Sequence, residues 1–403
     1  MELFHGVNID WMGKAKYFIG LSLFLLAVGW ASIWMNHGLR YGIDFRGGTL
    51  VVVRFASQPP LGEIRKGLQD VGLRNSTITP ISDISDPNSK NDIEISLDQS
   101  GENDAAIDAN RQAVIDALHK TFPTSHGKPD FNTISQADLA AYLTQSNPLS
   151  LGVNAADRYT QLARALAGSR DRLGIVSNFN QLASVDGVTP AVLSSLSNQY
   201  DLGSFAPRSV ESVGPRVGAQ LRNQALLATL YALLGMLVYI AFRFEWVYGA
   251  AAVIAVFHDV LITLGFFSLR KYEISLTVIA ALLTLVGYSM NDTIVIFDRV
   301  RENLRLMRRE SFPDIVNKSI NQTLSRTILT SGLTLLTVLV LYLLGGEVLR
   351  AFSFAMVAGV VVGTYSSFGI AAPIVVFWHK HYGKGNAVSV GSAAAKRATA
   401  DGR

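Results

Sequence analysis

Long apolar blocks alternate with polar sequence along this chain. A helix that spans the hydrocarbon core of a bilayer needs about 20 mainly apolar residues, and any other backbone conformation there leaves peptide groups without hydrogen-bond partners. Six blocks meet this requirement, at 16–35, 221–242, 246–267, 274–297, 327–345 and 350–378. The pattern therefore predicts a polytopic α-helical membrane protein, with one transmembrane helix before a polar stretch at 36–220 and a five-helix bundle at 221–378.

The polar stretch has the pattern of a small α+β domain. Short β-branched or alternating runs typical of strands lie at 49–55, 76–82, 92–98 and 205–213. Segments with the apolar spacing of helices lie at 61–71 and 105–122. The order β-α-β-β-α, closed by the fourth strand, favours a ferredoxin-like domain inserted between the first two membrane helices.

Residues 123–204 are interpreted as an insertion into that domain. The stretch is rich in Ser, Asn, Gln and Ala, and its sequence predicts only short helices, at 136–143, 155–167 and 190–199. Gly214 and Pro215 then mark the turn back into the membrane.

The distribution of basic residues predicts how the chain crosses the membrane. Lys14 and Lys16 lie on either side of the end of the N-terminal segment 1–15, and further Lys and Arg are concentrated in the 298–324 loop and in the tail 379–403. By the positive-inside rule these segments are cytoplasmic, and the 36–220 domain lies in the periplasm. The same segments explain much of the net charge of +4, so no nucleic-acid partner is expected. The Gly-, Ala- and Ser-rich tail is expected to be disordered.

The composition of the chain and its lack of enzymatic motifs argue against an enzyme. Hydrophobic residues make up 49% of the 403 residues and charged residues only 16%, as in a membrane protein. Cysteine is absent, which excludes disulfides, thiolate metal sites and a cysteine nucleophile. HExxH, P-loop, nucleophile-elbow and dinucleotide motifs are also missing, and we expect no metal and no cofactor. An intramembrane aspartyl protease using Asp259 and Asp292 is a distant alternative, because no glycine flanks either residue.

Ionisable groups inside the predicted helices are the candidate functional residues. A charge at a helix centre costs about 2.5–3.5 kcal/mol on insertion, so such groups are rarely incidental. His258 and Asp259 lie near the middle of the third span, Asp292 follows Asn291 in the fourth, and Arg326 begins the fifth. An Asp292–Arg326 pair would hold the carboxylate ionised, whereas desolvation would favour protonation. Switching between these states would suit a proton relay.

Each candidate also has a structural interpretation. Arg326 could be an interfacial arginine whose guanidinium reaches the headgroups, and Asp292 could be a buried hydrogen-bonding group. The adjacent His258 and Asp259 could form a static polar contact between helices.

Helical periodicity adds two further patterns. A polar stripe continues from Arg326 through Thr330, Thr334 and Thr337. Small residues repeat every four positions in the sixth span, at Ala355, Gly359, Gly363 and Ser367, and predict close helix packing. Gly287 in the fourth span is a further expected packing position.

Directly after the first span, residues 42–48 read Gly-Ile-Asp-Phe-Arg-Gly-Gly and resemble the signature of the SecF family. This family is the smaller partner in the bacterial SecD–SecF protein-export complex, within the resistance-nodulation-division superfamily. The matching signature positions are Gly42, Ile43, Asp44, Phe45, Gly47 and Gly48. They form the expected connector between the first span and the outer domain, through which repacking of the membrane helices would move that domain. Further similar blocks lie at 213–218, 257–261, 286–293, 297–303, 324–327 and 362–367.

The resemblance implies an accessory subunit of the Sec preprotein translocase in the bacterial inner membrane. Its implied partners are SecD and the SecYEG translocon, with YajC and YidC as further candidates, and its implied client is the translocating preprotein. A proton or sodium gradient would drive the periplasmic domains to promote late-stage export. The family's essential membrane charges map onto Asp292 and Arg326, while His258, Asp259, Asn291 and Thr330 are further candidates for ion coupling.

The resemblance leaves other points open. The family's periplasmic domain is usually much shorter, so residues 123–204 have no counterpart that it explains. An exporter of lipids or small molecules from the same superfamily, or a translocon scaffold that conducts no ions, would be compatible with the same membrane helices.

Overall fold

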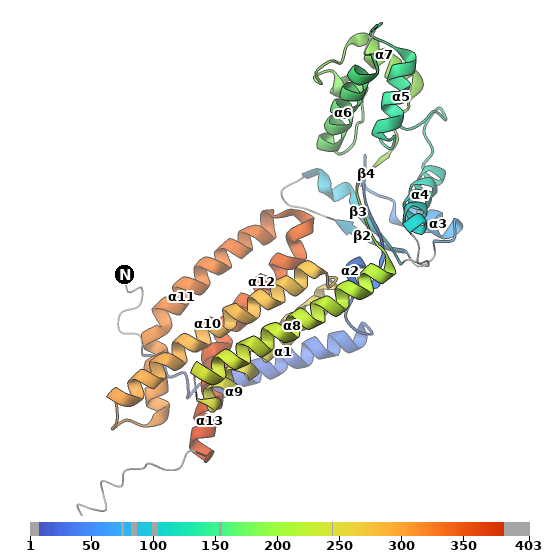
Figure 1. Cartoon of the computed structure of the whole chain (residues 1–403). Helices are drawn as coiled ribbons and strands as arrows, with labels where there is room; N and C mark the ends of the chain where they lie inside the picture. The colour runs from blue at the N-terminus through green and yellow to red at the C-terminus, as the bar shows by residue number, and fades with distance from the viewer. Residues whose placement is uncertain are drawn as a thin grey trace, which may run out of the picture.

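The computed structural model describes residues 8–73, 76–81, 87–98, 104–152, 155–243 and 245–382. The molecule is elongated, with a helix bundle at one end, a small sheet in the middle and a helical lobe at the far end (Figure 1). Most of the tail expected to be disordered, 383–403, lies outside the described residues, whereas residues up to Tyr382 are helical.

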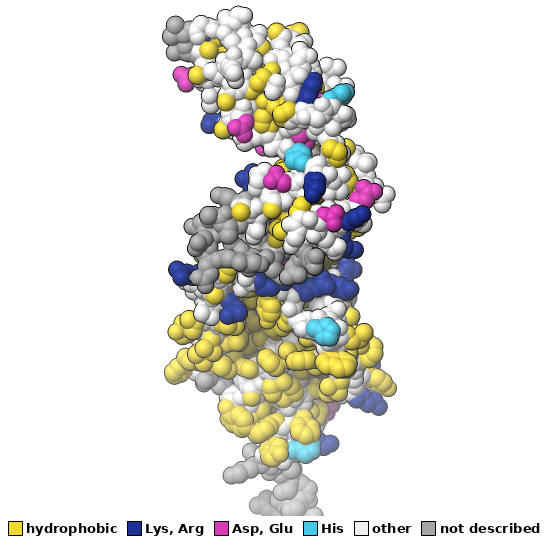
Figure 2. Space-filling model, turned by 90° about the vertical axis from the view of Figure 1, so that its right-hand side faces the viewer, with side chains coloured by type: hydrophobic (Ala, Val, Ile, Leu, Met, Phe, Trp, Pro, Cys, Tyr) yellow, Lys and Arg dark blue, Asp and Glu magenta, His cyan; other side chains and the backbone are white. Residues whose placement is uncertain are grey.

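Among the residues that the structure describes, six helices are long and apolar enough to cross a membrane. They are α1 (Ala15–Met35), α8 (Pro215–Arg243), α9 (Trp246–Arg270), α10 (Leu276–Leu306), α11 (Phe312–Leu344) and a sixth span made of α12 (Gly346–Ser366) and α13 (Ala372–Tyr382). Hydrophobic side chains gather over this bundle, and Lys and Arg side chains lie along its border with the sheet domain (Figure 2). The chain is therefore a multi-pass membrane protein.

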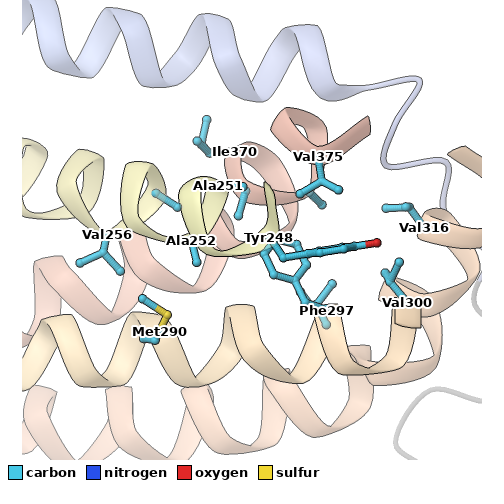
Figure 3. Packing of buried hydrophobic residues seen from close by; sticks show 14 of the residues in the cluster. Tyr248, Ala251, Ala252, Val256, Met290, Phe297, Val300, Val316, Ile370 and Val375 are labelled. Atoms are coloured by element: carbon cyan, nitrogen blue, oxygen red, sulfur yellow. The ribbon is translucent and has the colours of Figure 1, made fainter. Parts of the chain in front are cut away.

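Helices α9, α10 and α12 form the centre of the bundle, while α1, α8 and α11 are largely exposed. A buried cluster joins Tyr248 of α9 to Phe297 of α10 and Ile370 of the sixth span (Figure 3). The first span crosses α9 closely, because a Cβ added at Gly29 would lie 2.8 Å from the Cα of Gly265. Only glycine allows two helix backbones to approach so closely at this point.

The sixth span contains a π-helical turn, Ser367–Ala371. The N–H of Ala372 donates to the carbonyl of Ser367, five residues earlier, instead of four. The next residue is Pro373, which has no N–H and so cannot donate to the carbonyl of Gly369 as an α-helix requires. The local sequence thus favours a wider turn, a feature often found at functional sites.

The expected 298–324 loop is mostly helical, which corrects that part of the sequence interpretation. Helix α10 continues to Leu306 and α11 begins at Phe312, so only five residues, 307–311, connect them. Val300 on α10 and Val316 on α11 are buried in the same cluster. Charged residues occupy the exposed side of both helices and outnumber the buried apolar residues. The apolar spacing that indicates a helix is therefore difficult to recognise in the sequence.

The middle part is a four-stranded antiparallel sheet with strand order β2-β3-β1-β4. Its strands are β1 (Gly48–Phe55), β2 (Ser76–Ile81), β3 (Asp92–Asp98) and β4 (Phe205–Val213). Helices α3 (Leu61–Asp70) and α4 (Asp104–Thr121) pack on one face, where the inward side chains of β1 and β3 meet Ile64 and Leu118. The alternation of apolar residues in the strands is what buries one face and exposes the other.

The helical lobe has its own hydrophobic core, built from α5 (Gln136–Ser146), α6 (Ala155–Leu173) and α7 (Pro190–Gln199). The chain enters and leaves the lobe side by side, because Phe131 N donates to Asp201 O at 2.9 Å. Asn132 secures this junction, since its side-chain amide donates to the carbonyls of Val176 and Gly203. Nearby, burial raises the pKa of the Asp130 carboxyl, although two backbone N–H groups donate to it.

Candidate functional site

Asp292 lies on α10 with only 2% of its surface exposed. Its Oδ2 atom accepts a hydrogen bond of 2.9 Å from Ser331 Oγ on α11. A carboxylate buried among membrane helices has a high desolvation cost, which one hydroxyl offsets only in part. This position therefore suits a group that takes up and releases a cation.

Arg326 does not form the expected ion pair with Asp292 in this conformation. Its side chain is exposed on α11, and no ion pair joins the two residues in the described part of the chain. Ser331, which does bind Asp292, is five residues further along, about 140° around the helix at 3.6 residues per turn. Residues at a similar depth can thus face different directions, and here the serine faces Asp292.

Asp259 is completely buried and links three helices. Its Oδ1 atom lies 2.8 Å from His258 Nδ1 on the same helix. Its Oδ2 atom accepts hydrogen bonds from Ser289 Oγ of α10 at 2.6 Å and Ser366 Oγ of α12 at 2.7 Å. Ser289 and Asp292 are one turn apart on α10, so the two acidic positions share one stretch of that helix.

His258 completes this polar cluster. Its side chain is 7% exposed, and its Nε2 atom is buried without a hydrogen-bond partner among the described residues. The ring packs edge-on against Tyr365, with the centroids 6.1 Å apart. A buried ring nitrogen without a partner among the described residues is a position at which a proton or a hydrogen-bond donor can bind.

Two other predicted ion-coupling residues lie outside this cluster. The Thr330 hydroxyl donates to the backbone carbonyl of Arg326 at 3.0 Å, within its own helix. The hydroxyls of Thr334 and Thr337 also donate to backbone carbonyls four residues earlier. The threonines of this stripe therefore find acceptors within α11. Asn291 lies on the exposed side of α10.

The small-residue ridge of the sixth span packs against α10. A Cβ added at Gly359 would lie 2.5 Å from Leu285, and one at Gly363 would lie 3.0 Å from the Cβ of Ser289. Gly287 differs from the expectation, because a Cβ there would meet nothing within 4 Å. It lies on the exposed face of α10 and packs against no part of this chain that the structure describes.

The sequence interpretation missed three serines that bind the buried carboxylates, namely Ser289, Ser331 and Ser366. Serine is ordinary in membrane helices, so composition does not mark these positions. Two signals mark Ser289 and Ser366. Ser289 precedes Asp292 by one turn and Ser366 adjoins the small-residue ridge, and both serines lie in blocks that resemble the SecF family, 286–293 and 362–367. No group of three His, Asp or Glu side chains placed to hold a metal ion is found in the described ranges.

Family models and related sequences both place this chain among the SecD and SecF proteins. The family model for the C-terminal part of the protein export membrane proteins SecD and SecF matches residues 192–381, and that of the SecD/SecF GG motif matches residues 33–59. The chain is 50% identical over 398 residues to protein translocase subunit SecF of Koribacter versatilis, covering 95% of both chains. Most of residues 123–204 therefore have a counterpart in that relative.

A fused relative is also similar. The protein translocase subunit SecDF of Thermus thermophilus is 35% identical over 374 residues, which cover 92% of this chain and 38% of that protein. The crystal structure of SecDF from the same organism aligns with a TM-score of 0.63 at 30% identity, covering 93% of this chain and 39% of that one. The chain thus spans about two-fifths of the fused protein. It belongs to the SecF family of protein translocase subunits, which have an accessory role in protein export.

Proposed function

We propose that this subunit uses a transmembrane ion gradient to promote a late stage of protein export, with Asp292 as the ion-binding group. The observation that carries the proposal is the Asp292 carboxyl, which is 2% exposed inside a membrane helix and, among the described residues, hydrogen-bonded to a single hydroxyl. Moving one charge through the membrane potential supplies about 2.3 kcal/mol per 100 mV. Neutralising Asp292 on the high-potential side and releasing the ion on the other would make that energy available.

Rotation or sliding of α11 is the helix movement we propose for this cycle. When Asp292 is neutral, the Ser331 hydroxyl suffices as its partner. When Asp292 is ionised, its charge would attract Arg326, which lies on the same helix as Ser331 but on another face. Exchange of these partners requires α11 to turn, and the exposed position of Arg326 leaves it free of the bundle core. Asp259, His258, Asn291 and Thr330 are proposed as supporting groups along this path.

The orientation and the outer fold form part of the same proposal. Five arginines lie around the α10–α11 connection, namely Arg299, Arg301, Arg305, Arg308 and Arg309, which supports placing it and both termini in the cytoplasm. The sheet domain and the lobe would then be periplasmic. The strand order β2-β3-β1-β4 with two helices on one face supports a ferredoxin-like description of this domain.

SecD is the proposed partner within the membrane. In the fused Thermus thermophilus relative this chain covers only 38% of the protein, which leaves room for a second set of helices. A stripe of small and polar residues on the exposed face of α10 would receive that partner, consisting of Thr277, Ala280, Thr284, Gly287 and Asn291. The SecYEG translocon, YajC and YidC are further proposed partners.

Replacing Asp292 tests the proposal. In vesicles that contain the translocon, SecD and this chain, Asp292→Asn should abolish the stimulation of export by a proton or sodium gradient while SecD still co-purifies. Asp298→Asn is the matched control, because Asp298 lies on the same helix but is exposed and paired with Arg243. Unchanged stimulation in Asp292→Asn would contradict the proposal. If the wild-type chain promotes export equally well without any gradient, a translocon scaffold that conducts no ions would be favoured.

A further inference from the structure

The short helix α2 (Ile43–Arg46), which follows the first span, contacts the N-terminal end of α10, the helix that carries Asp292. Gly42 N donates to Ile274 O at 2.9 Å, and Ile274 N donates to Arg40 O at 2.7 Å. These two bonds pair the segment before α2 with the loop before α10. The connector is therefore attached to that loop through its own backbone.

Asp44 extends this attachment to α10 itself. Its Oδ2 atom accepts a hydrogen bond of 2.9 Å from the backbone N–H of Leu276, the first residue of α10. The first N–H groups of a helix have no partner within the helix, and a carboxylate there is also favoured by the helix dipole. Ser275 binds the N–H of Val278, so two side chains share this helix end. Asp44 thus caps α10 although it lies more than 200 residues earlier in the chain.

Apolar packing also stabilises the contact between α2 and the start of α10. Phe45 is 7% exposed and belongs to one buried cluster with Ile274 and Val278. An ion pair between Arg46 and Glu273, at 3.5 Å, lies at the more exposed rim. Displacing α2 from α10 would therefore break backbone bonds, a helix cap and an apolar contact together.

The two glycines after α2 attach the connector to the sheet domain. Gly47 and Gly48 have φ angles of +75° and +147°, which side chains with a Cβ rarely adopt. A Cβ at Gly47 would lie 2.8 Å from the Cα of Pro215, at the start of α8. Gly48 is already the first residue of β1, whose backbone pairs with β3 and β4. One short segment thus contacts α10, α8 and the sheet.

From these contacts we infer that Asp44 is a positioning residue that couples α10 to the outer domain. We call the contacts of Asp44 and Phe45 with the start of α10 the joint. Asp292 lies about 24 Å from the joint along α10, at 1.5 Å per residue. When α11 turns against α10 at Asp292, we expect α10 to shift or tilt in response. Because α10 is one continuous helix, that movement reaches Leu276, and the Asp44 cap passes it to β1. The inference rests on the proposed ion coupling, but it assigns a separate role to a residue that binds no ion.

The test separates ion movement from export, using the complete chain with SecD and the translocon in vesicles. Asp44→Ala should keep gradient-driven ion flux and lose the gradient stimulation of export. Asp44→Asn keeps a side-chain oxygen that can accept from Leu276 N–H, and it should restore most of the stimulation. Glu63→Ala is the matched control, because Glu63 is an exposed acidic residue in the first turn of α3 and should leave both measurements at the wild-type level.

Two results would overturn the inference, namely full stimulation in Asp44→Ala or equal loss in Asp44→Ala and Asp44→Asn. The Asp292→Asn variant keeps the two proposals distinguishable. If it loses both flux and stimulation while Asp44→Ala loses neither, only the joint is wrong. If it loses neither, the ion coupling itself is wrong.

A second measurement on the wild-type protein covers the case in which Asp44→Ala does not accumulate in the membrane. The Leu276 amide should remain protected from hydrogen exchange with and without an imposed gradient, because the joint moves as one piece. Loss of that protection when the gradient is imposed would show that the joint opens, and the inference would fail.

Discussion

A carboxyl inside a membrane bundle needs hydrogen-bond donors, and Asp259 obtains its donors from three helices. Ser289, Ser366 and His258 all contact it within 2.8 Å. Because each donor comes from a different position on α9, α10 or α12, the cluster fixes how these helices are rotated relative to one another. Asp292 has one serine donor and therefore keeps more freedom to change partner.

Ser366→Ala should destabilise the bundle more than Ser353→Ala, although both serines are buried on α12. Ser366 donates to Asp259 across the helix interface, so its loss should cost about 1 kcal/mol. The Ser353 hydroxyl donates to the carbonyl of Leu349 in its own helix. That carbonyl keeps its backbone hydrogen bond when the hydroxyl is removed. Thermal unfolding followed by tryptophan fluorescence measures the difference, because all five tryptophans lie before residue 35 or after residue 245. Equal shifts in Tm would contradict it.

The sequence predicts which residues are ionisable within the spans, but not which groups they bind. Asp292, Asp259 and His258 stand out because charge is costly in lipid. The partner of each depends on helix rotation, which a single sequence does not specify. Arg326 and Asp292 have suitable depth and charge, yet a serine on another face of α11 occupies the contact.

At the level of elements, the helical lobe is the most independent part of the chain. The buried residues of its core all come from 131–200, and the sheet core uses none of them. The chain crosses into the lobe at Asp130 and returns at Asp201, where the two segments are paired. An element with a separate core and adjacent ends behaves as an insertion.

Excision of the lobe should therefore leave the rest folded. Replacing residues 131–200 with a short Gly/Ser linker should keep the tryptophan-monitored unfolding of the bundle and the co-purification of SecD unchanged. Hydrogen exchange of β1, β3 and β4 tests the sheet directly, since their amides should stay protected. Rapid exchange throughout these strands would show that the sheet depends on the lobe.

Sequence patterns predicted the strands and spans more closely than the helix ends. Strand alternation and apolar blocks depend on local burial, so they are visible along the chain. The helical continuation of α10 and α11 beyond the membrane depends on contact between the two helices, such as Asn303 with Ser319 at 2.8 Å. A charged segment buries few side chains, and its helices are therefore easily taken for a loop.

At the scale of the whole molecule, the exposed surfaces of the bundle differ in character. Helices α1, α8 and α11 expose many large apolar side chains, as expected for contact with lipid. The exposed face of α10 instead carries Thr284, Gly287 and Asn291 at helical spacing. Small and polar residues allow close helix approach in membranes and gain little from facing lipid. This difference is the reason for placing SecD on α10.

Gly287→Leu compared with Gly235→Leu tests that placement. Both glycines lie on exposed faces of membrane helices, and a Cβ at either would meet nothing within 4 Å in this chain. Neither variant should lower the unfolding temperature of the isolated chain, because no internal contact is disturbed. Gly287→Leu should strongly reduce the SecD recovered with this chain, since a leucine on α10 would block close approach, whereas Gly235→Leu on α8 should recover the wild-type amount. If both variants retain SecD equally, the polar face of α10 is not the interface, and the partner must bind on one of the apolar faces.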